Sequence, residues 1–244
     1  MMLSALGSIA QDRPLAPPRL SQRRFPATSA VVLLLAVATP LPALQAPPRF
    51  LYVYRDSLRH GVDSTYRAIE DEAARICADL RCPNPYLGLE SLSGPHEAWW
   101  INAFDTDADT TRVVTAYARN RPLMDALRAV TERKAALVGK PIEGYAVYRP
   151  DLSRGPPWSA AGARFVVARI TRSRHPSEGS VWETADSTLY VLRPVGTHQQ
   201  ARALAREPGA RIFAVRPNWS LPAPEWVAAD PVFWRLAPAS RPGR

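Results

Sequence analysis

The sequence contains few residues whose types and spacing suit catalysis. Its four histidines, His60, His96, His175 and His198, lie in predicted loops or at the starts of predicted elements, without a second histidine or a carboxylate at a helical metal-binding spacing. His96 lies in a predicted turn, where an imidazole could serve as a catalytic base. Glu90 lies in a strand predicted to be buried on both faces, where burial would raise the pKa of its carboxyl group. His96 and Glu90 are therefore the candidate catalytic residues. The alternative to a catalytic role for Glu90 is that it pairs with an arginine or is exposed at a sheet edge. The sequence predicts no metal site.

Five aromatic side chains could line a pocket for an apolar ligand: Tyr52, Tyr54, Trp99, Trp100 and Tyr145. Packing inside a barrel is the competing explanation for aromatic residues at these positions. The sequence contains no nucleophile elbow, no phosphate-binding glycine loop and no dinucleotide-binding fingerprint. It therefore predicts no cofactor.

Cys77 and Cys82 are the only cysteines, and they lie near the end of a predicted helix. A zinc site would need two further ligands at a matching spacing, and none is apparent. In an oxidising compartment, a disulfide between the two could tie the end of the helix to the loop at Pro83. An unpaired, buried state of the cysteines is the alternative.

The N-terminal region has the pattern of a secretory signal peptide. A pair of arginines precedes an apolar core at residues 30–38, two helix-breaking prolines follow, and a small residue, Ala46, comes after them. The apolar core is about half as long as the roughly 20 residues that a membrane span needs. We therefore expect residues 1–46 to be removed near Ala46 and the remainder to be exported, periplasmic or extracellular, without a stable membrane anchor.

The formal net charge of +9 at first suggests a protein that binds nucleic acid. However, Lys134 and Lys140 are the only lysines, so 29 of the 31 basic residues are arginine, alongside 25 prolines. A GC-rich genome produces this bias by itself. The arginines are also scattered, and they form no basic stripe with interleaved aromatic residues. We therefore expect no nucleic-acid partner.

Residues 86–104, which contain several of these candidates, are predicted to form a β-hairpin. Two runs of apolar and aromatic residues flank the turn-forming sequence at residues 93–96. Side chains alternate across a strand, so Trp99 and Trp100 must point to opposite faces of the sheet. A sheet with one solvated face would rarely carry a large aromatic side chain there. The pair therefore predicts a sheet that is covered on both faces.

Residues 47–153 have the element order β-α-β-β-α-β of a ferredoxin-like unit. Asp63 is the expected N-cap of the first helix, and Asn120 is the expected cap where Pro122 interrupts the second helical region. Helices in this order cover one face of an antiparallel sheet and leave the other bare. The predicted elements are a strand at residues 49–55, a helix at 64–80, the hairpin, a helical region at about 110–138 and a strand at 142–149.

Residues 164–220 contain a degenerate copy of this unit. The sequence Arg-Pro-Asp-Leu-Ser at residues 149–153 recurs as Arg-Pro-Asn-Trp-Ser at residues 216–220, each time after a predicted strand. The segment between the first two strands of the copy is too short for a helix, so the order becomes β-β-β-α-β. The predicted elements are strands at residues 164–171, 180–184, 188–192 and 210–216 and a helix at 197–206 with Thr197 as its N-cap.

Together, these elements predict an α+β fold. Two ferredoxin-like units, the second without its first helix, pack sheet to sheet as in a dimeric α/β-barrel, which gives the tryptophan pair its second cover. Residues 154–163 form the predicted linker, and residues 221–244 form a tail that contains prolines and tryptophans. We expect the tail to pack over the face that the missing helix leaves uncovered.

The chain resembles the dimeric α/β-barrel superfamily, which includes antibiotic-biosynthesis-monooxygenase-like and NIPSNAP-like domains. In particular, it resembles exported bacterial proteins that carry two such units in tandem. The matching features are residues 86–91 and 93–99 of the hairpin, the acidic start of the next helix at residues 105–109, and residues 148–153. The resemblance covers most of residues 49–220 and is weaker in the second half.

This resemblance implies an exported, soluble protein that binds a small apolar ligand or a partner through its barrel, as a monomer with an intramolecular barrel or as a homodimer. The alternative is a cofactor-independent oxygenase or isomerase-like enzyme that acts on aromatic substrates. The binding function predicts an aromatic cavity without converging titratable groups. The enzymatic function requires a polar residue, such as His96 or Glu90, that points into an enclosed pocket.

Overall fold

The computed structural model describes residues 46–175 and 177–238, so the predicted signal peptide, apart from Ala46, lies outside the described residues. In chain order the elements are β1 (Phe50–Ser57), α1 (Asp63–Asp79), β2 (Leu87–Ser91), β3 (Glu97–Phe104), α2 (Asp107–Arg119), α3 (Arg121–Lys134), β4 (Ile142–Tyr148), β5 (Ser153–Arg154), β6 (Phe165–Thr171), β7 (Ser177–Glu178), β8 (Ser180–Thr184), β9 (Leu189–Val195), α4 (His198–Leu204), β10 (Ala210–Val215), η1 (Pro217–Trp219), α5 (Pro224–Ala229) and α6 (Pro231–Trp234).

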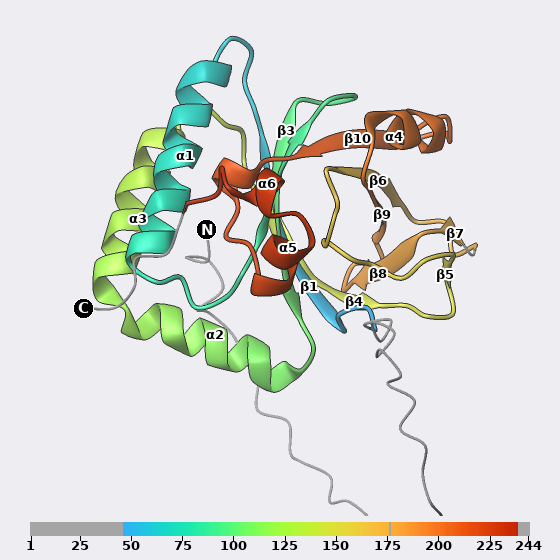
Figure 1. Ribbon diagram of the computed structural model, residues 1–244, viewed down its shortest axis with the longest axis horizontal. Coiled ribbons are helices and arrows are strands. Elements are labelled where there is room, and N and C mark those ends of the chain that lie inside the picture. Colours follow the sequence, from blue (N-terminus) through green and yellow to red (C-terminus); the bar gives the residue numbers. More distant parts are fainter. Residues whose placement is uncertain (1–45, 176, 239–244) are drawn as a thin grey trace, which may run out of the picture. The chain divides into compact units, whose positions relative to one another are not determined.

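Eight of these strands close into an antiparallel barrel with the order β1-β3-β2-β10-β6-β9-β8-β4. Figure 1 shows the strands of the two halves beside each other. The first half contributes the order β4-β1-β3-β2, and the second half contributes the equivalent order β10-β6-β9-β8. The two sheets join edge to edge, at β2 with β10 and at β4 with β8. The predicted fold class is confirmed: two ferredoxin-like units form an α/β-barrel, and the second unit lacks its first helix.

The two tryptophans of the hairpin lie on opposite sides of the barrel wall. Trp99 points inward and packs against Phe213 and Tyr190, with ring centroids 4.5 and 5.8 Å apart. Trp100 belongs to the outer layer of side chains beneath the helices, where its ring lies 5.8 Å from that of Tyr54. Both tryptophans are fully buried. As predicted, the wall is covered on both faces here, because inward-facing residues of all eight strands fill the barrel and the helices cover the outside.

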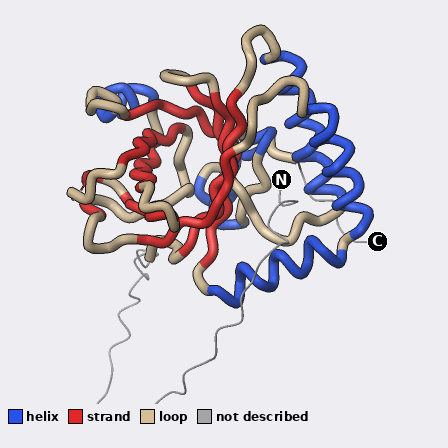
Figure 2. The backbone as a smooth tube through the Cα atoms, turned by 180° about the vertical axis from the view of Figure 1, so that it is seen from behind, coloured by secondary structure: helices blue, strands red, loops and turns tan. Residues whose placement is uncertain are grey.

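The outer covers of the two halves differ. Helices α1, α2 and α3 lie along one side of the strands and cover the first half (Figure 1, Figure 2). The second half has the short helix α4, whose Ala201 packs on Val167 and Ile212. The outer face of β8 and β9 is covered by Leu152, from the segment that follows β4. This segment also forms the short parallel pair of β5 with β7, which the sequence pattern did not predict.

The repeated Arg-Pro-Asp/Asn-x-Ser motif makes hydrogen bonds at the two seams between the halves, which are the pairing of β4 with β8 and the pairing of β2 with β10. In the first copy, the Ser153 hydroxyl donates to the carbonyl of Arg149 (2.7 Å) and accepts from the N–H of Val181 in β8 (3.0 Å). In the second copy, the Ser220 hydroxyl donates to the carbonyl four residues before it (2.7 Å) and accepts from the N–H of Gly88 in β2 (2.9 Å). Each motif follows the last strand of one half and binds the second strand of the other. The repeat therefore has a structural role at both seams.

The C-terminal tail closes one end of the barrel, and the prediction that it covers the helix-free face was wrong. Trp234 of α6 joins the interior core together with Trp158 of the linker. Asp230 accepts a hydrogen bond from Arg164, just before the start of β6 (2.8 Å). The outer face of β8 and β9 already has its cover in Leu152. The aromatic residues of the tail are buried instead against the apolar interior that would otherwise meet solvent at the barrel end.

Helix boundaries follow the expected capping residues except at α1. Asn120 lies between α2 and α3, and its side chain accepts a hydrogen bond from the first turn of α3 (3.3 Å). Thr197 caps α4 in a capping box, as predicted. Asp63 is the first residue of α1 and not its N-cap, and the residue before it makes no side-chain capping bond. The Asp63 carboxylate lies 3.5 Å from His96 instead.

Candidate binding site at the open end of the barrel

A cavity of about 510 Å³ opens at the end of the barrel opposite the tail. The end of β1, the start of β4 and the turn between β8 and β9 bound it. Gly144 of β4 helps to form it, because a Cβ atom at this position would meet no other heavy atom within 4 Å. The lining residues are Arg55, Ile142, Glu143, Gly144, Tyr145, Ile170, Thr184, Ala185, Asp186, Thr188 and Tyr190.

The turn between β8 and β9 forms the rim of the cavity. Asp186 accepts hydrogen bonds from the hydroxyl groups of Thr184 and Thr188. These hydrogen bonds lower the pKa of the Asp186 carboxyl group. Ser187 adopts the left-handed conformation, with φ of 62°, that such a tight turn needs. Asp186 is thus tied into the turn, where it holds the two threonines at the rim.

Two arginines share one buried carboxylate at the inner end of the cavity, which only Arg55 of the three lines. We call Arg55, Glu97 and Arg211 the charged floor. Glu97 accepts hydrogen bonds from Arg55 Nη2 (3.0 Å) and from Trp99 Nε1 (2.6 Å). Its Oε1 atom also lies 3.3 Å from Arg211 Nη1. The exposed fractions of these charged side chains are 12% for Arg55, 7% for Glu97 and 13% for Arg211.

The charged floor carries a net positive charge at neutral pH. Burial by itself would raise the pKa of Glu97, but hydrogen bonds from Trp99 and Arg55, together with the charges of Arg55 and Arg211, bring it below its ordinary value. Glu97 is therefore ionised at neutral pH. One carboxylate then faces two guanidinium groups, which leaves one positive charge uncompensated within the floor.

Aromatic rings hold both guanidinium groups in place. That of Arg55 lies 4.8 Å from the Trp99 ring centroid, and that of Arg211 lies 5.4 and 5.5 Å from the rings of Trp99 and Phe213. The stem of Arg211 passes close to the turn between β2 and β3. A Cβ at Gly94, which has φ of 76°, would lie 2.7 Å from Arg211 Cδ. The two positive charges therefore have defined positions.

The five aromatic residues singled out from the sequence do not meet in one cavity. Tyr52, Tyr54 and Trp100 point out of the barrel and are buried in the layer beneath the helices. Trp99 points inward and contacts the charged floor. Tyr145 is the one of the five that lines the cavity, but its ring packs against the outer layer, 5.1 Å from the ring of Tyr52. Strand alternation separates the set into two layers, which a list of aromatic positions does not reveal.

The two candidate catalytic residues lie away from the cavity. Glu90 is buried, but it points out of β2 and accepts hydrogen bonds from Arg67 Nη2 (2.7 Å) and Arg216 Nε (2.5 Å). The structure thus pairs Glu90 with arginine, which is the alternative interpretation of this residue. His96 lies in the turn before β3, with 31% of its side chain exposed, beside the Asp63 carboxylate. Neither residue lines the cavity at the open end.

Sequence reasoning missed the charged floor, although the sequence contains a signal for it. Arg55, Glu97 and Arg211 each lie two residues from a buried inward-facing side chain of the same strand, so strand alternation points them inward too. A charged residue at an inward-facing position is costly unless it is paired. In the sequence, these three positions can therefore be recognised as paired buried charges, because each interrupts an otherwise apolar inward face.

A second network of buried charges lies beneath the helices. Lys134 of α3 lies 2.7 Å from Asp56 and 3.0 Å from Glu70, and all three are almost fully buried. Burial by itself would lower the pKa of Lys134, but the neighbouring charges of Glu70 and Asp56 raise it. Burial also raises the pKa of Glu70. This network joins α1 and α3 to β1 and lies in a different layer from the cavity.

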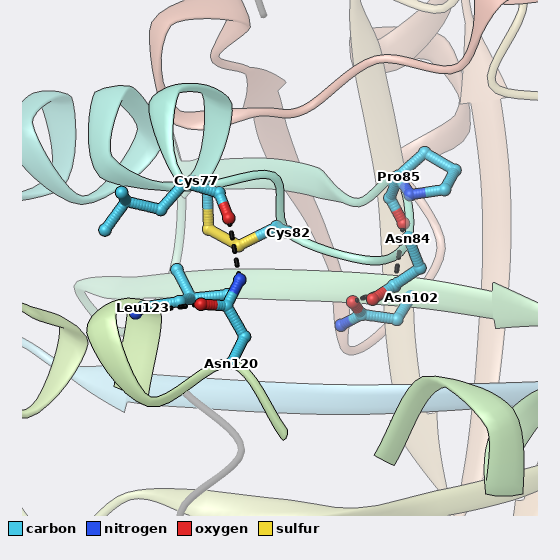
Figure 3. The surroundings of a disulfide bond; sticks show 8 residues. Cys77, Cys82, Asn84, Pro85, Asn102, Asn120 and Leu123 are labelled. Carbon is cyan, nitrogen blue, oxygen red and sulfur yellow. Dashed lines mark hydrogen bonds between the residues drawn. A yellow bond between two sulfur atoms is a disulfide. The ribbon is translucent and has the colours of Figure 1, made fainter. Parts of the chain in front are cut away.

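The structure joins Cys77 and Cys82 by a disulfide at the end of α1 (Figure 3). Beside it, the Asn120 side chain donates a hydrogen bond to a carbonyl at the end of α1 (2.8 Å). Asn84, in the loop that follows, donates to the side chain of Asn102 in β3 (2.8 Å). The disulfide and the two asparagines thus anchor the connection from α1 to β2.

Within residues 46–175 and 177–238, no helix is long and apolar enough to cross a membrane. In the same part of the chain, no three His, Cys, Asp or Glu side chains are grouped so that they could hold a metal ion.

The comparisons with known proteins give distant similarities to solved structures, two of which are described here. No protein-family model matches the sequence, and no curated protein matches it. A putative monooxygenase from Fusobacterium nucleatum subsp. nucleatum is similar with a TM-score of 0.41 and 8% identity, over 73% of this chain and 94% of that chain. A putative monooxygenase from Lactobacillus acidophilus is similar with a TM-score of 0.40 and 9% identity, over 69% of this chain and 93% of that chain. At these TM-scores neither similarity supports a function, so the function is argued from the cavity and its chemistry.

Proposed function

We propose that this chain is an exported binding protein that holds a small, largely apolar molecule in the cavity at the open end of its barrel. The observation that carries the proposal is the cavity itself, which lies beside the apolar interior of the barrel. Ile142, Ile170 and Tyr190 offer apolar walls, while the threonines of the rim offer hydroxyl groups at the entrance. An apolar wall with a few polar groups is typical of small-molecule sites.

The size of the cavity is consistent with useful affinity. Burial of about 200 Å² of apolar ligand surface would contribute roughly 5 kcal/mol before the cost of association. Part of the wall is preformed, because Tyr190 packs edge-on against Trp99. The barrel also closes within a single chain, so the proposed site is complete without a second copy.

Binding has better support than catalysis because the carboxyl groups of the cavity are engaged in hydrogen bonds within its walls. Glu143 accepts a hydrogen bond from the Tyr52 hydroxyl, and Asp186 is tied to the threonines of its turn. A cofactor-independent oxygenase or isomerase-like enzyme would need an acid or base aimed at the substrate. His96 and Glu90, the candidates for that role, do not line the cavity.

Two features support export. Residues 20–46 have the charged, apolar and small-residue segments of a secretory signal. The disulfide between Cys77 and Cys82 is of a kind that persists in oxidising compartments. We expect the exported protein to contain no free thiol in a thiol-labelling assay under non-reducing, denaturing conditions, whereas one or two free thiols would contradict this part of the proposal.

Filling the cavity should abolish binding. Gly144→Phe places a ring in the open space above Gly144, so the affinity for the neutral fluorescent dye N-phenyl-1-naphthylamine should fall at least about tenfold. Val147→Phe is the matched control, because it adds the same ring to the same strand on the exposed outer face. A fluorescence titration of wild type and both variants decides the matter. Wild-type binding that survives in Gly144→Phe would contradict the proposed site.

A further inference from the structure

We propose that the molecule bound at the open end is an amphipathic anion, with an aromatic or aliphatic body and one carboxylate or similar singly charged oxyanion that binds to Arg55. This inference rests on the proposed function and specifies the chemical class of the ligand. It is carried by the contact of the cavity with the charged floor, which nothing in the binding of a neutral molecule would require.

Arg55 has one donor group that is not committed to a partner among the described residues. Its Nε and Nη2 atoms donate to the Glu97 carboxylate, whereas its Nη1 atom makes no hydrogen bond to any of the described residues. Arg55 is also one of the residues that line the cavity. A carboxylate that enters the cavity could therefore accept a charge-assisted hydrogen bond from Nη1 without breaking the existing pair.

The charge of the floor favours an anion over a neutral group. Glu97 compensates one of the two guanidinium charges, and its ionised form also accepts the Trp99 N–H. The acids nearer the entrance, Glu143 and Asp186, accept hydrogen bonds from neutral hydroxyl groups, which do not compensate the charge of a carboxylate. The excess positive charge is therefore confined to the charged floor at the inner end of the site, where an ion pair is stronger than in bulk water.

The same count limits the ligand to a single negative charge. A phosphate monoester, with nearly two charges, would meet one net positive charge at the floor and the carboxylates of Glu143 and Asp186 at the wall and rim. A monoanion with an apolar body matches both the apolar walls and the floor. The guanidinium of Arg55 is already held over the Trp99 ring, so little side-chain freedom is lost on binding.

The test compares two dyes that differ by one anionic group, titrated into the full-length protein. N-phenyl-1-naphthylamine is neutral, and 8-anilinonaphthalene-1-sulfonate has the same rings and a sulfonate. We expect the sulfonate to bind at least about tenfold more tightly. If the neutral dye binds and the sulfonate binds no better, the anion inference is overturned while the proposed function stands. If neither dye binds, the proposed function falls and the anion inference falls with it.

A variant series assigns the preference to Arg55. Arg55→Gln should remove the advantage of the sulfonate, so that the two dyes bind to the variant with affinities within about twofold of each other. Arg128→Gln, which removes an equal charge from the exposed face of α3, is the matched control and should change neither affinity. Retention of the full sulfonate preference in Arg55→Gln would overturn the assignment.

A measurement on wild type keeps the inference testable if Arg55→Gln does not fold. Decanoate and decan-1-ol share an alkyl chain and differ in charge. Decanoate should displace the neutral dye at a concentration at least about tenfold lower than decan-1-ol. Displacement by both at equal concentrations would contradict a role for an anionic group.

Discussion

The two ends of the barrel enclose the same apolar interior in opposite ways. At the closed end, the linker and the tail bring aromatic rings together, with Trp158 packed edge-on against Trp182 (5.6 Å between centroids) and Phe233 against Trp234 (5.1 Å). At the open end, the charged floor takes the place of such a plug, and a cavity lies outside it. One end is closed by segments outside the two strand units, and the other is left accessible.

We propose that the closed end serves the stability of the barrel and that the open end serves binding. Aromatic residues at the closed end remove apolar surface from water, which stabilises the barrel. The arginines at the open end contribute little net stability, because the cost of desolvating a charge offsets much of the gain from pairing it. We propose that their arrangement serves a ligand. The predictions below test this division of roles.

The largest effect is expected at the closed end. Trp234→Ala should lower the free energy of unfolding by about 3–5 kcal/mol, because it empties part of the plug. Urea unfolding measures the change, and Val232→Ala in the same helix, at an exposed position, is the control. Trp234→Phe should lower the free energy of unfolding much less than Trp234→Ala does, since the Trp234 indole N–H has no hydrogen-bond partner among the described residues. A loss below about 1 kcal/mol for Trp234→Ala would contradict the role of the tail as a plug.

A smaller effect is expected for Glu97→Gln at the open end. It should lower the free energy of unfolding by about 1–3 kcal/mol, because it leaves two buried guanidinium groups without a carboxylate. The loss should depend on pH. The pKa of Glu97 is lower in the folded chain than its ordinary value of 4.5, so the unfolded chain binds more protons as the pH falls below that value. The stability that ionised Glu97 contributes is thus present above pH 4.5 and is lost as the pH falls through its folded pKa.

Unfolding of wild type and Glu97→Gln at neutral pH and at about pH 3 checks this sign. The gap between the two proteins should narrow at the lower pH. A gap that stays constant or widens would show that Glu97 does not titrate with the lowered pKa on which the charge count of the floor depends.

The smallest effect is expected at the rim. Asp186→Asn should change the free energy of unfolding by less than about 1 kcal/mol, because its hydrogen bonds to the threonines lie in an exposed turn. It should at the same time strengthen binding of the sulfonate dye by a few-fold, since a negative charge near the entrance is removed. Weaker binding of the sulfonate would place Asp186 in contact with the ligand as a positive determinant instead.

The sequence predicted the parts of this structure that depend on local pattern. Strand alternation placed Trp99 and Trp100 on opposite faces, and the side-chain oxygens of Asn120 and Thr197 marked helix starts correctly. The absence of the first helix from the second unit was predicted because the connection between the first two strands of that unit is too short to hold a helix. These features need no knowledge of distant contacts.

The site was not predicted, because it depends on closure of the barrel. Arg55, Glu97 and Arg211 come from three strands that are far apart in the sequence, and β10 meets β2 only where the second half joins the first. The position of the tail was also not predictable from the sequence. The composition around Trp234 indicated that the tail is buried, but not against which surface. Seven charged or aromatic candidates drawn from the sequence therefore divided among the outer layer, the hairpin turn and the barrel interior.

A crystal structure of the complex with 8-anilinonaphthalene-1-sulfonate tests the account most directly, because a smaller cavity of about 210 Å³ lies at the closed end beside Trp158 and Trp226. The account predicts the dye at the open end, with its rings against Ile170 and Tyr190 and its sulfonate within hydrogen-bond distance of Arg55 Nη1. Dye bound at the closed end, or at the open end with its sulfonate turned to solvent, would contradict it.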